Sequence, residues 1–346
     1  MCLGQTHMSA LVAERCCCPS GNSTYPNRRI CFLPPKVIQF TQMEPAIQVE
    51  DLVKRFASFT AVDGISLAVK RGEIFGILGP NGAGKTTTLE IIEGLQKPTQ
   101  GKVTVLGLDI LKDTVQIKAR IGVQLQSSAY FNYLSLKEIL VLLASFYPKS
   151  LNPDELLDQV GLKDKSRQRI KELSGGQVQR FTVAASLIND PELVILDEPT
   201  TGLDPQARHN LWELIRDIHD RNVTVVLTTH YMDEAEHLAD HIALMSKGVI
   251  LSYGTVSEII SKEAGTILTF TVKDAEQVLY EGLKSLASFQ GDFVTIKTDT
   301  SIQILHELTS WALDQNQTIH DLRVKQPTLE QVYLDIIMAS QEEDKT

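Results

Sequence analysis

The sequence predicts an α/β protein with a mainly parallel core sheet, an antiparallel β-subdomain, a helical insert and a small C-terminal α/β domain. Three short runs, at 73–79, 192–199 and 223–230, are nearly continuous in apolar residues, as strands buried on both faces are. Helical patterns separate these runs, and such alternation is typical of a parallel α/β core. The intervening helices are predicted at 86–94, 177–190 and 207–220.

Three earlier segments alternate well enough to be strands, and their short linkers predict that they pair in an antiparallel sheet. They lie at 46–56, 64–72 and 101–107. Residues 127–172 have a mostly helical pattern and lie between two core strands, so we interpret them as a helical insert. Ser135 and Glu138 have the spacing of a capping box at the start of a helix in this insert.

The pattern changes near residue 262. Two further strands are predicted at 266–274 and 292–299, and a helix at 301–316. We therefore expect one domain over 45–262 and a small accessory domain over 265–346.

Composition disfavours several classes of function. The 346 residues suffice for two domains, and the formal net charge is −10 without a local basic patch, so we expect no nucleic-acid partner. No apolar run approaches the ~18 residues of a membrane span. The first residues also lack the pattern of a signal peptide. We therefore expect a cytoplasmic chain.

The N-terminal segment differs from the rest of the chain. It carries all five cysteines, at Cys2, Cys16, Cys17, Cys18 and Cys31. An odd number with three in a row fits neither a disulfide framework nor the spacing of a zinc site. We expect 1–44 to be a disordered or non-native extension, and hypothesise that translation begins at Met43. N-terminal sequencing of the native protein would test this, and a chain beginning near Met1 would contradict it.

A phosphate-binding loop is predicted at 79–86, where GPNGAGKT follows a buried strand and opens a helix. Its glycines allow backbone N–H groups to point at phosphates, Lys85 adds positive charge, and Thr86 can hold Mg²⁺. This strand–loop–helix context predicts a P-loop NTPase core that binds ATP. The expected nucleotide contacts are Gly79, Pro80, Asn81, Gly82, Ala83, Gly84, Lys85, Thr86 and Thr87.

Acidic residues follow the second buried strand. Asp197 ends that strand, where ligands of open α/β sheets bind, and is predicted to hold Mg²⁺. Glu198 comes next and is predicted to orient or deprotonate the attacking water, in preference to a helix-capping or salt-bridged role. His230 ends the third buried strand at the same edge and is predicted to sense the phosphate, although a lone histidine is more often structural.

A second glycine-containing motif, LSGGQVQR at 173–180, has the make-up of an anion-binding helix start. With the other motifs, in their order and spacing, it resembles the ATP-binding subunit of an ABC transporter over roughly 46–262. The motifs are the phosphate loop, Gln126 after IGVQL, LSGGQ (173–177), LVILDEP, GLDP (202–205) and TTH (228–230).

The resemblance implies ATP hydrolysis by a head-to-tail dimer, with ATP held between the phosphate loop of one copy and the LSGGQ motif of the other. It implies that Phe56 stacks on adenine, where the family more often has Tyr, and that Gln126 contacts Mg²⁺ and the lytic water. Asp204 would cross the dimer interface. The partner's nucleotide would meet Ser174, Gly175, Gly176 and Gln177.

The family also implies a separate integral membrane permease, which would dock near the helical insert and hold the chain at the inner face of the cell membrane. The segment QPTLEQVYLDII (326–337) resembles the tail of daunorubicin-resistance-type exporter ATPases, so we expect export. The chain has one nucleotide domain, so the assembly needs two copies or a near-relative as the second subunit, and we expect a homodimer. One alternative is a soluble ATPase of the same superfamily. A DNA-repair ATPase is disfavoured because the sustained heptads of its long coiled coil are absent. A non-catalytic adaptor is disfavoured because Lys85, Asp197 and Glu198 are all present.

His237 and His241 lie four residues apart, with Glu234 and Asp240 nearby. On one helix this spacing could supply half a metal site. We interpret the group instead as a solvated helix face without a metal.

Overall fold

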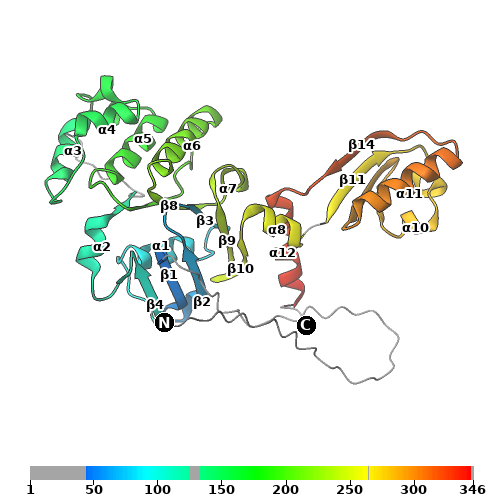
Figure 1. Ribbon diagram of the computed structural model, residues 1–346, viewed down its shortest axis with the longest axis horizontal. Coiled ribbons are helices and arrows are strands. Elements are labelled where there is room, and N and C mark those ends of the chain that lie inside the picture. The colour runs from blue at the N-terminus through cyan, green and yellow to red at the C-terminus, as the bar shows by residue number, and fades with distance from the viewer. Residues whose placement is uncertain (1–43, 125–132, 264, 344–346) are drawn as a thin grey trace, which may run out of the picture. The chain divides into compact units, whose positions relative to one another are not determined.

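The computed structural model describes residues 44–124, 133–263 and 265–343 (Figure 1). The first sheet has the order β2-β1-β4-β5 and is antiparallel throughout, as predicted. Its strands are β1 (Ile47–Phe56), β2 (Phe59–Val69), β4 (Gln100–Val105) and β5 (Leu108–Asp109). Ile47 pairs with Val69 on one side and with Val105 on the other, so β1 lies between β2 and β4.

The core sheet has six strands in the order β10-β9-β3-β8-β7-β6. All neighbours are parallel except β10, which runs antiparallel to β9. Every residue of β3, β7 and β8 is buried, which explains their continuous apolar sequences. The strands are β3 (Ile74–Leu78), β6 (Ile121–Val123), β7 (Leu193–Asp197), β8 (Thr224–Thr229), β9 (His241–Ser246) and β10 (Val249–Gly254).

Alternate residues of the core strands enter two different hydrophobic clusters, as the two-residue period of a strand requires. Leu193 and Ile195 of β7 join a cluster with α1 (Lys85–Ile92), α2 (Thr114–Arg120) and the antiparallel sheet. Val194 and Leu196 face the opposite way, toward α5 (Gly175–Ser186) and α6 (Pro205–His219). The core sheet is therefore covered on both faces.

The helical insert extends this second cluster. Its described part contains α3 (Leu136–Ala144), α4 (Pro153–Gln159) and two short 3₁₀ turns at Lys163–Lys165 and Ile170–Glu172. Ser135 and Glu138 form the predicted capping box at the start of α3. Leu136 of α3 and Phe181 of α5 are both fully buried in the same cluster, so the insert is packed onto the core.

The C-terminal region has its own four-stranded antiparallel sheet, in the order β12-β13-β11-β14, and its own hydrophobic core. The strands are β11 (Thr266–Thr271), β12 (Ala287–Gln290), β13 (Phe293–Thr298) and β14 (His320–Lys325). Its helices are α9 (Ala275–Val278), α10 (Glu281–Lys284) and α11 (Ser301–Asp314). The sequence predicted β11, β13 and α11 and missed β12 and β14.

The last helix, α12 (Leu329–Glu343), differs from the expectation that residues 265–346 form one separate domain. Leu329, Val332 and Tyr333 join a cluster with α7 (Met232–Leu238) and α8 (Val256–Glu263), next to the core sheet. The apolar periodicity of a helix predicts a buried face, but it does not identify the surface that covers this face.

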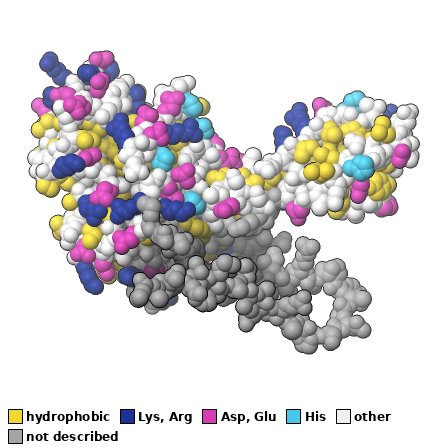
Figure 2. Space-filling view, in the orientation of Figure 1, with side chains coloured by type: hydrophobic (Ala, Val, Ile, Leu, Met, Phe, Trp, Pro, Cys, Tyr) yellow, Lys and Arg dark blue, Asp and Glu magenta, His cyan; other side chains and the backbone are white. Residues whose placement is uncertain are grey.

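Lys/Arg and Asp/Glu side chains are interspersed over the visible face of the protein in Figure 2. No described helix is long and apolar enough to cross a membrane.

Candidate nucleotide-binding and hydrolysis site

The phosphate loop connects β3 to α1, as predicted, and curls around the ammonium group of Lys85. Lys85 Nζ donates to the carbonyl oxygens of Gly79, at 2.9 Å, and Pro80, at 3.2 Å. Gly79 and Gly84 have φ values of 158° and 101°, and a Cβ on either would approach a backbone oxygen within 2.5 Å. Glycine is therefore required at both positions by conformation and by space.

The exposed part of the loop is available to a ligand. Pro80, Asn81 and Gly82 are exposed or partly so, whereas Ala83 and Lys85 are buried, and Thr86 and Thr87 are half-buried at the start of α1. Backbone N–H groups at the start of a helix favour anions, and Lys85 adds a full positive charge at the same place. This arrangement suits the phosphates of a nucleotide.

The acidic residues at the end of β7 meet the loop lysine. Lys85 Nζ lies 3.4 Å from Glu198 Oε1. Asp197 is 8% exposed, and the hydroxyl of Thr228 on the neighbouring strand donates to its carboxylate. The phosphate loop and both acidic residues thus meet at the carboxyl edge of the core sheet, where open α/β sheets bind ligands.

The backbone of Glu198 is held in an uncommon conformation, with a φ of 47°. Its N–H donates to the carbonyl oxygen of Thr228 at 3.2 Å and to the hydroxyl at 3.0 Å. The Thr201 hydroxyl donates to Glu198 Oε2 at 3.1 Å. A non-glycine residue keeps a left-handed conformation only where its neighbours enforce it. The two bonds to Thr228 hold the Glu198 backbone, and the bond from Thr201 holds its carboxylate, which lies beside Lys85.

His230 completes the group, because its Nδ1 lies 3.3 Å from Glu198 Oε2. Its ring packs on Tyr231 at a centroid distance of 4.1 Å, and the Arg208 guanidinium covers the Tyr231 ring. Burial would raise the pKa of Glu198, but the charge of Lys85, the Thr201 hydroxyl and His230 together bring this pKa below its usual value. Glu198 is therefore ionised at neutral pH.

The LSGGQ motif forms a second, separate hollow. Ser174 caps α5 in a capping box with Gln177, and the Asp204 carboxylate caps α6 by accepting the N–H of Ala207 at 2.9 Å. The two helix starts line a hollow of about 450 Å³, whose lining includes Gly175, Gly176, Gly202 and Asn210 and none of residues 79–87. The phosphate loop and the hollow at the starts of α5 and α6 thus lie at different places on one chain.

Phe56 lies at the end of β1 with 43% of its surface exposed. Lys54 Nζ lies 4.8 Å from the centre of its ring and donates to the carbonyl oxygen of Lys97. The ring is accessible for stacking on a planar base. Gln126, the remaining predicted contact, lies outside the described residues.

Two threonines at the site were not predicted from the sequence: Thr228, which contacts both Asp197 and Glu198, and Thr201. Thr228 belongs to the TTH motif, but only the pairing of β7 with β8 places its hydroxyl beside the acidic residues.

His237 and His241 lie on different elements, α7 and β9, so their spacing is not that of one helix face. The His237 ring packs on Trp212 at 4.7 Å, and His241 Nδ1 lies 2.9 Å from Glu73 Oε2. Within the described ranges, no group of three or more His, Cys, Asp or Glu side chains could hold a metal ion by itself.

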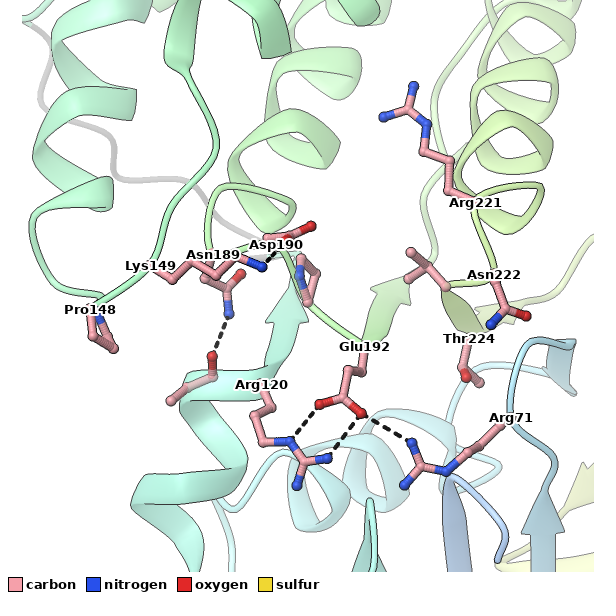
Figure 3. Close-up of a pocket in the computed structure, with 13 residues that line it drawn as sticks. Arg71, Arg120, Pro148, Lys149, Asn189, Asp190, Glu192, Arg221, Asn222 and Thr224 are labelled. Carbon is pink, nitrogen blue, oxygen red and sulfur yellow. Dashed lines mark hydrogen bonds and ion pairs between the residues drawn. The ribbon is translucent and has the colours of Figure 1, made fainter. Parts of the chain in front are cut away.

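A cavity of about 490 Å³ lies at the opposite, amino edge of the core strands (Figure 3). Glu192 occupies its centre and accepts from Arg120 at 2.6 and 2.9 Å and from Arg71 at 3.1 Å. The bonds from Arg120 and from Arg71 outweigh burial and lower the pKa of Glu192. These ion pairs connect the β2–β3 turn, the end of α2 and the start of β7, which is a structural role.

The fold and the site define a nucleotide-hydrolysing protein of the P-loop class. Residues 62–201 match the family model described as ABC transporter. The linearmycin resistance ATP-binding protein LnrL of Bacillus subtilis (strain 168) is 34% identical over 84% of this chain and 97% of that protein. The daunorubicin resistance ATP-binding protein DrrA3 of Streptomyces coeruleorubidus is 33% identical over 85% of this chain and 96% of that protein.

Among solved structures, a dimeric post-hydrolysis state of the ATP-binding cassette MJ0796 with ADP and Pi has a TM-score of 0.55 and 26% identity, over 60% of this chain and 98% of that one. The chain therefore belongs to the ATP-binding proteins of ABC transporters, and it is an ABC-type ATPase. The predicted resemblance to the daunorubicin-resistance type is confirmed.

Proposed function

We propose that this chain is the ATP-hydrolysing subunit of an ABC exporter, which works as a homodimer docked on a separate integral membrane permease. The observation that carries the catalytic part is the meeting of Lys85, Glu198 and His230. The side-chain nitrogens of Lys85 and His230 lie 3.4 and 3.3 Å from the two oxygens of the Glu198 carboxylate. A cation, a carboxylate and a histidine at the edge of the sheet suit the hydrolysis of the terminal phosphoanhydride bond of a bound nucleoside triphosphate.

In this proposal ATP binding separates Lys85 from Glu198: Lys85 pairs with the γ-phosphate, and Glu198 is left to act on the attacking water. The γ-phosphate of ATP competes with Glu198 for Lys85, because the phosphate carries more negative charge than one carboxylate. Loss of the Lys85 partner raises the pKa of Glu198 and makes the carboxylate a better proton acceptor for the attacking water. His230 then donates a hydrogen bond to the γ-phosphate, and this bond exists only while the γ-phosphate is bound.

Asp197 and Thr86 are the proposed ligands of Mg²⁺, with Gln126 as a further contact. A carboxylate and a hydroxyl are ligands that this hard cation prefers, and phosphate oxygens and waters usually complete its octahedron. The bond from Thr228 orients the Asp197 carboxylate for this task. When bound, the ion would neutralise charge on the phosphates.

The second half of each site comes from the partner copy in this proposal. The starts of α5 and α6 offer N–H groups and helix dipoles in one hollow, which suits a γ-phosphate presented from outside the chain. Ser174, Gly176 and Asp204 would thus face the nucleotide held by the phosphate loop of the other copy, and Phe56 would stack on the adenine of the nucleotide held by its own chain.

Export is supported by the names of the relatives, which describe resistance to linearmycin and to daunorubicin. Resistance through an ATP-binding transport protein is explained by removal of the compound from the cell. A permease contact at the helical insert would place the chain at the cytoplasmic face of the cell membrane.

The test combines Glu198→Gln with isolation of the chain from membranes of its host. Glu198→Gln should retain ATP binding, lower steady-state ATPase by at least about a hundredfold, and accumulate an ATP-bound dimer, because the proton acceptor is lost. Glu213→Gln makes the same chemical change at an exposed site on α6 and should leave turnover unchanged. Undiminished turnover in Glu198→Gln would exclude the proposed proton acceptor.

The transport part of the proposal is tested by the partners of the tagged chain in detergent-solubilised membranes. A polytopic membrane protein at equal copy number is the expected result. Recovery from the soluble fraction alone would contradict docking on a permease.

A further inference from the structure

An aromatic ring connects the histidine of the site to helix α6. Tyr231 follows His230 in the chain, and the two ring centroids lie 4.1 Å apart with an angle of 38° between the ring planes. From α6, the guanidinium carbon of Arg208 lies 4.1 Å from the centre of the Tyr231 ring. A guanidinium at this distance is attracted to the electron-rich face of the ring. Arg208, Tyr231 and His230 therefore form a continuous series of side-chain contacts.

The Arg208 side chain is held between α6 and α7. It is 20% exposed, and its Nη1 donates to Asp233 Oδ2 on α7 at 3.4 Å. Its Nε is buried and has no hydrogen-bond partner among the described residues. A buried N–H without a hydrogen bond is unfavourable, and contact of the guanidinium with the face of the Tyr231 ring offsets part of this cost.

The other end of the series fixes the orientation of the His230 ring. His230 Nδ1 is buried and lies 3.3 Å from Glu198 Oε2. The side chain as a whole is 32% exposed, so its accessible part lies away from Nδ1. Tyr231 is itself anchored, because its backbone N–H donates to the Thr229 hydroxyl at 2.9 Å. The packed Tyr231 ring restricts rotation of the imidazole, which keeps Nδ1 beside Glu198 and another part of the ring accessible to a phosphate.

The α6 end of the series begins beside the hollow that contains the LSGGQ motif. The Arg208 backbone N–H donates to the carbonyl oxygen of Asp204 at 2.9 Å, within the first turn of α6. Asp204 lines that hollow and, in the proposed dimer, faces the nucleotide of the partner copy. Arg208 and Tyr231 therefore lie between the helix start proposed to meet the partner and the histidine proposed to meet the chain's own nucleotide.

We propose that Arg208 and Tyr231 are positioning residues for ATP hydrolysis, which hold the His230 ring beside Glu198 through their stacked contacts. This inference rests on the proposed ATPase site. Arg208 acts through Tyr231, and Tyr231 acts through His230. The Tyr231 hydroxyl makes no hydrogen bond within the described residues, so the ring carries the role.

The test measures steady-state ATPase and equilibrium ATP binding for single and double variants of the full-length chain. In Tyr231→Leu and in Arg208→Met we expect kcat to fall by about fivefold to fiftyfold, with the Kd for ATP within about twofold of the parent value, because misplaced catalytic groups slow the chemistry. The double variant should be no more than about twofold slower than the slower single variant, since either change interrupts the same series of contacts.

Two conservative variants are the matched controls. Tyr231→Phe keeps the ring and should keep kcat within about twofold of the parent value, since the π-face is retained. Asp233→Asn removes the charged partner of Arg208 at a site that is 61% exposed. Exposed ion pairs contribute little, so kcat should again stay within about twofold of the parent value.

Parental kcat in Tyr231→Leu or in Arg208→Met would overturn the proposal. Multiplied losses in the double variant would also overturn it, because they indicate two independent effects. A kcat in Asp233→Asn as low as in Arg208→Met would assign the effect to the ion pair instead of the ring contact, and would equally overturn it.

If Tyr231→Leu does not fold, Arg208→Met carries the test, because methionine is a good helix former and keeps an unbranched side chain on α6. The lower kcat with unchanged ATP affinity is expected there, and loss of ATP affinity in step with kcat would overturn the proposal. Absence of hydrolysis by the parent chain would overturn the proposed function, and this inference with it.

Discussion

At the scale of single residues, Glu93 shows how the core beneath the nucleotide site depends on pH. This residue ends α1 and is 6% exposed. Burial, and then the negative charges of Asp197 and Glu90, raise the pKa of Glu93 to about 7. The folded protein therefore keeps a proton on Glu93 at a pH where the unfolded chain has lost it.

The prediction concerns Glu93→Gln. Because the folded pKa is raised, the stability linked to Glu93 is fully present below about pH 4.5 and is lost as the pH rises through about 7. Glutamine cannot ionise, so the variant should gain stability relative to the parent between about pH 5 and pH 8, by up to roughly 3 kcal/mol. Urea unfolding at both pH values measures this, and Glu213→Gln is the exposed control. An equal difference at the two pH values would contradict the assignment.

Lys85, Asp197, Glu198 and His230 could be identified from the sequence because each belongs to a motif tied to a strand end, and the structure brings them together. The role of Thr228 in orienting Asp197 and the raised pKa of the buried Glu93 could not be predicted. Both arise from contacts between segments far apart in the chain, such as the bond from Thr228 to Asp197, and no local pattern encodes those contacts.

At the scale of elements, the fully buried core strands were the easiest to predict, because burial on both faces leaves a continuous apolar run. Strand β14 was missed because its alternation is short: only Leu322 and Val324 are apolar, and all six residues of the strand are exposed. Helix α12 was not predicted, and the surface that covers it could not be identified from the sequence either. The sequence of a helix indicates how much of its surface is apolar, and tertiary structure decides where that surface is buried.

The docking of α12 leads to a prediction for Val332→Asp. Val332 is 0% exposed between α12 and the helices α7 and α8, so an aspartate would bury an unpaired charge and detach the helix. Faster hydrogen exchange and faster chymotryptic cleavage in α12 are expected, with ATP binding retained. Leu334→Asp on the same helix, where the side chain is 47% exposed, is the matched control and should leave α12 protected. Equal protection in both variants would contradict the observed docking.

At the scale of the whole molecule, the phosphate loop and the LSGGQ hollow lie at separate places, and in the proposed function they form one site only across a dimer. The hollow at the starts of α5 and α6 has none of the phosphate-loop residues in its lining. In the proposed head-to-tail dimer, each phosphate loop would meet the LSGGQ motif of the other copy. In a symmetric dimer this creates two equivalent composite sites.

Mixing of two inactive variants tests this arrangement. Lys85→Ala disables the phosphate loop and Ser174→Arg disables the LSGGQ motif, so each homodimer should be inactive. A mixed dimer carries both defects in one composite site and leaves the other site intact. Equal mixing should therefore restore about a quarter of the parental ATPase, since half of the dimers are mixed and each has one working site.

The control is a mixture of Lys85→Ala with Glu198→Gln. Both changes affect the same half of a composite site, so every site in the mixed dimer has one defect and no activity should return. Recovery of ATPase activity in this control would mean that mixing restores activity for a reason other than the formation of an intact composite site. Absence of restoration with Lys85→Ala and Ser174→Arg would mean either that the LSGGQ hollow does not complete the partner's site or that one intact site cannot work alone. Trapping of an ATP-bound dimer by Glu198→Gln distinguishes these two, because only the second preserves the shared interface.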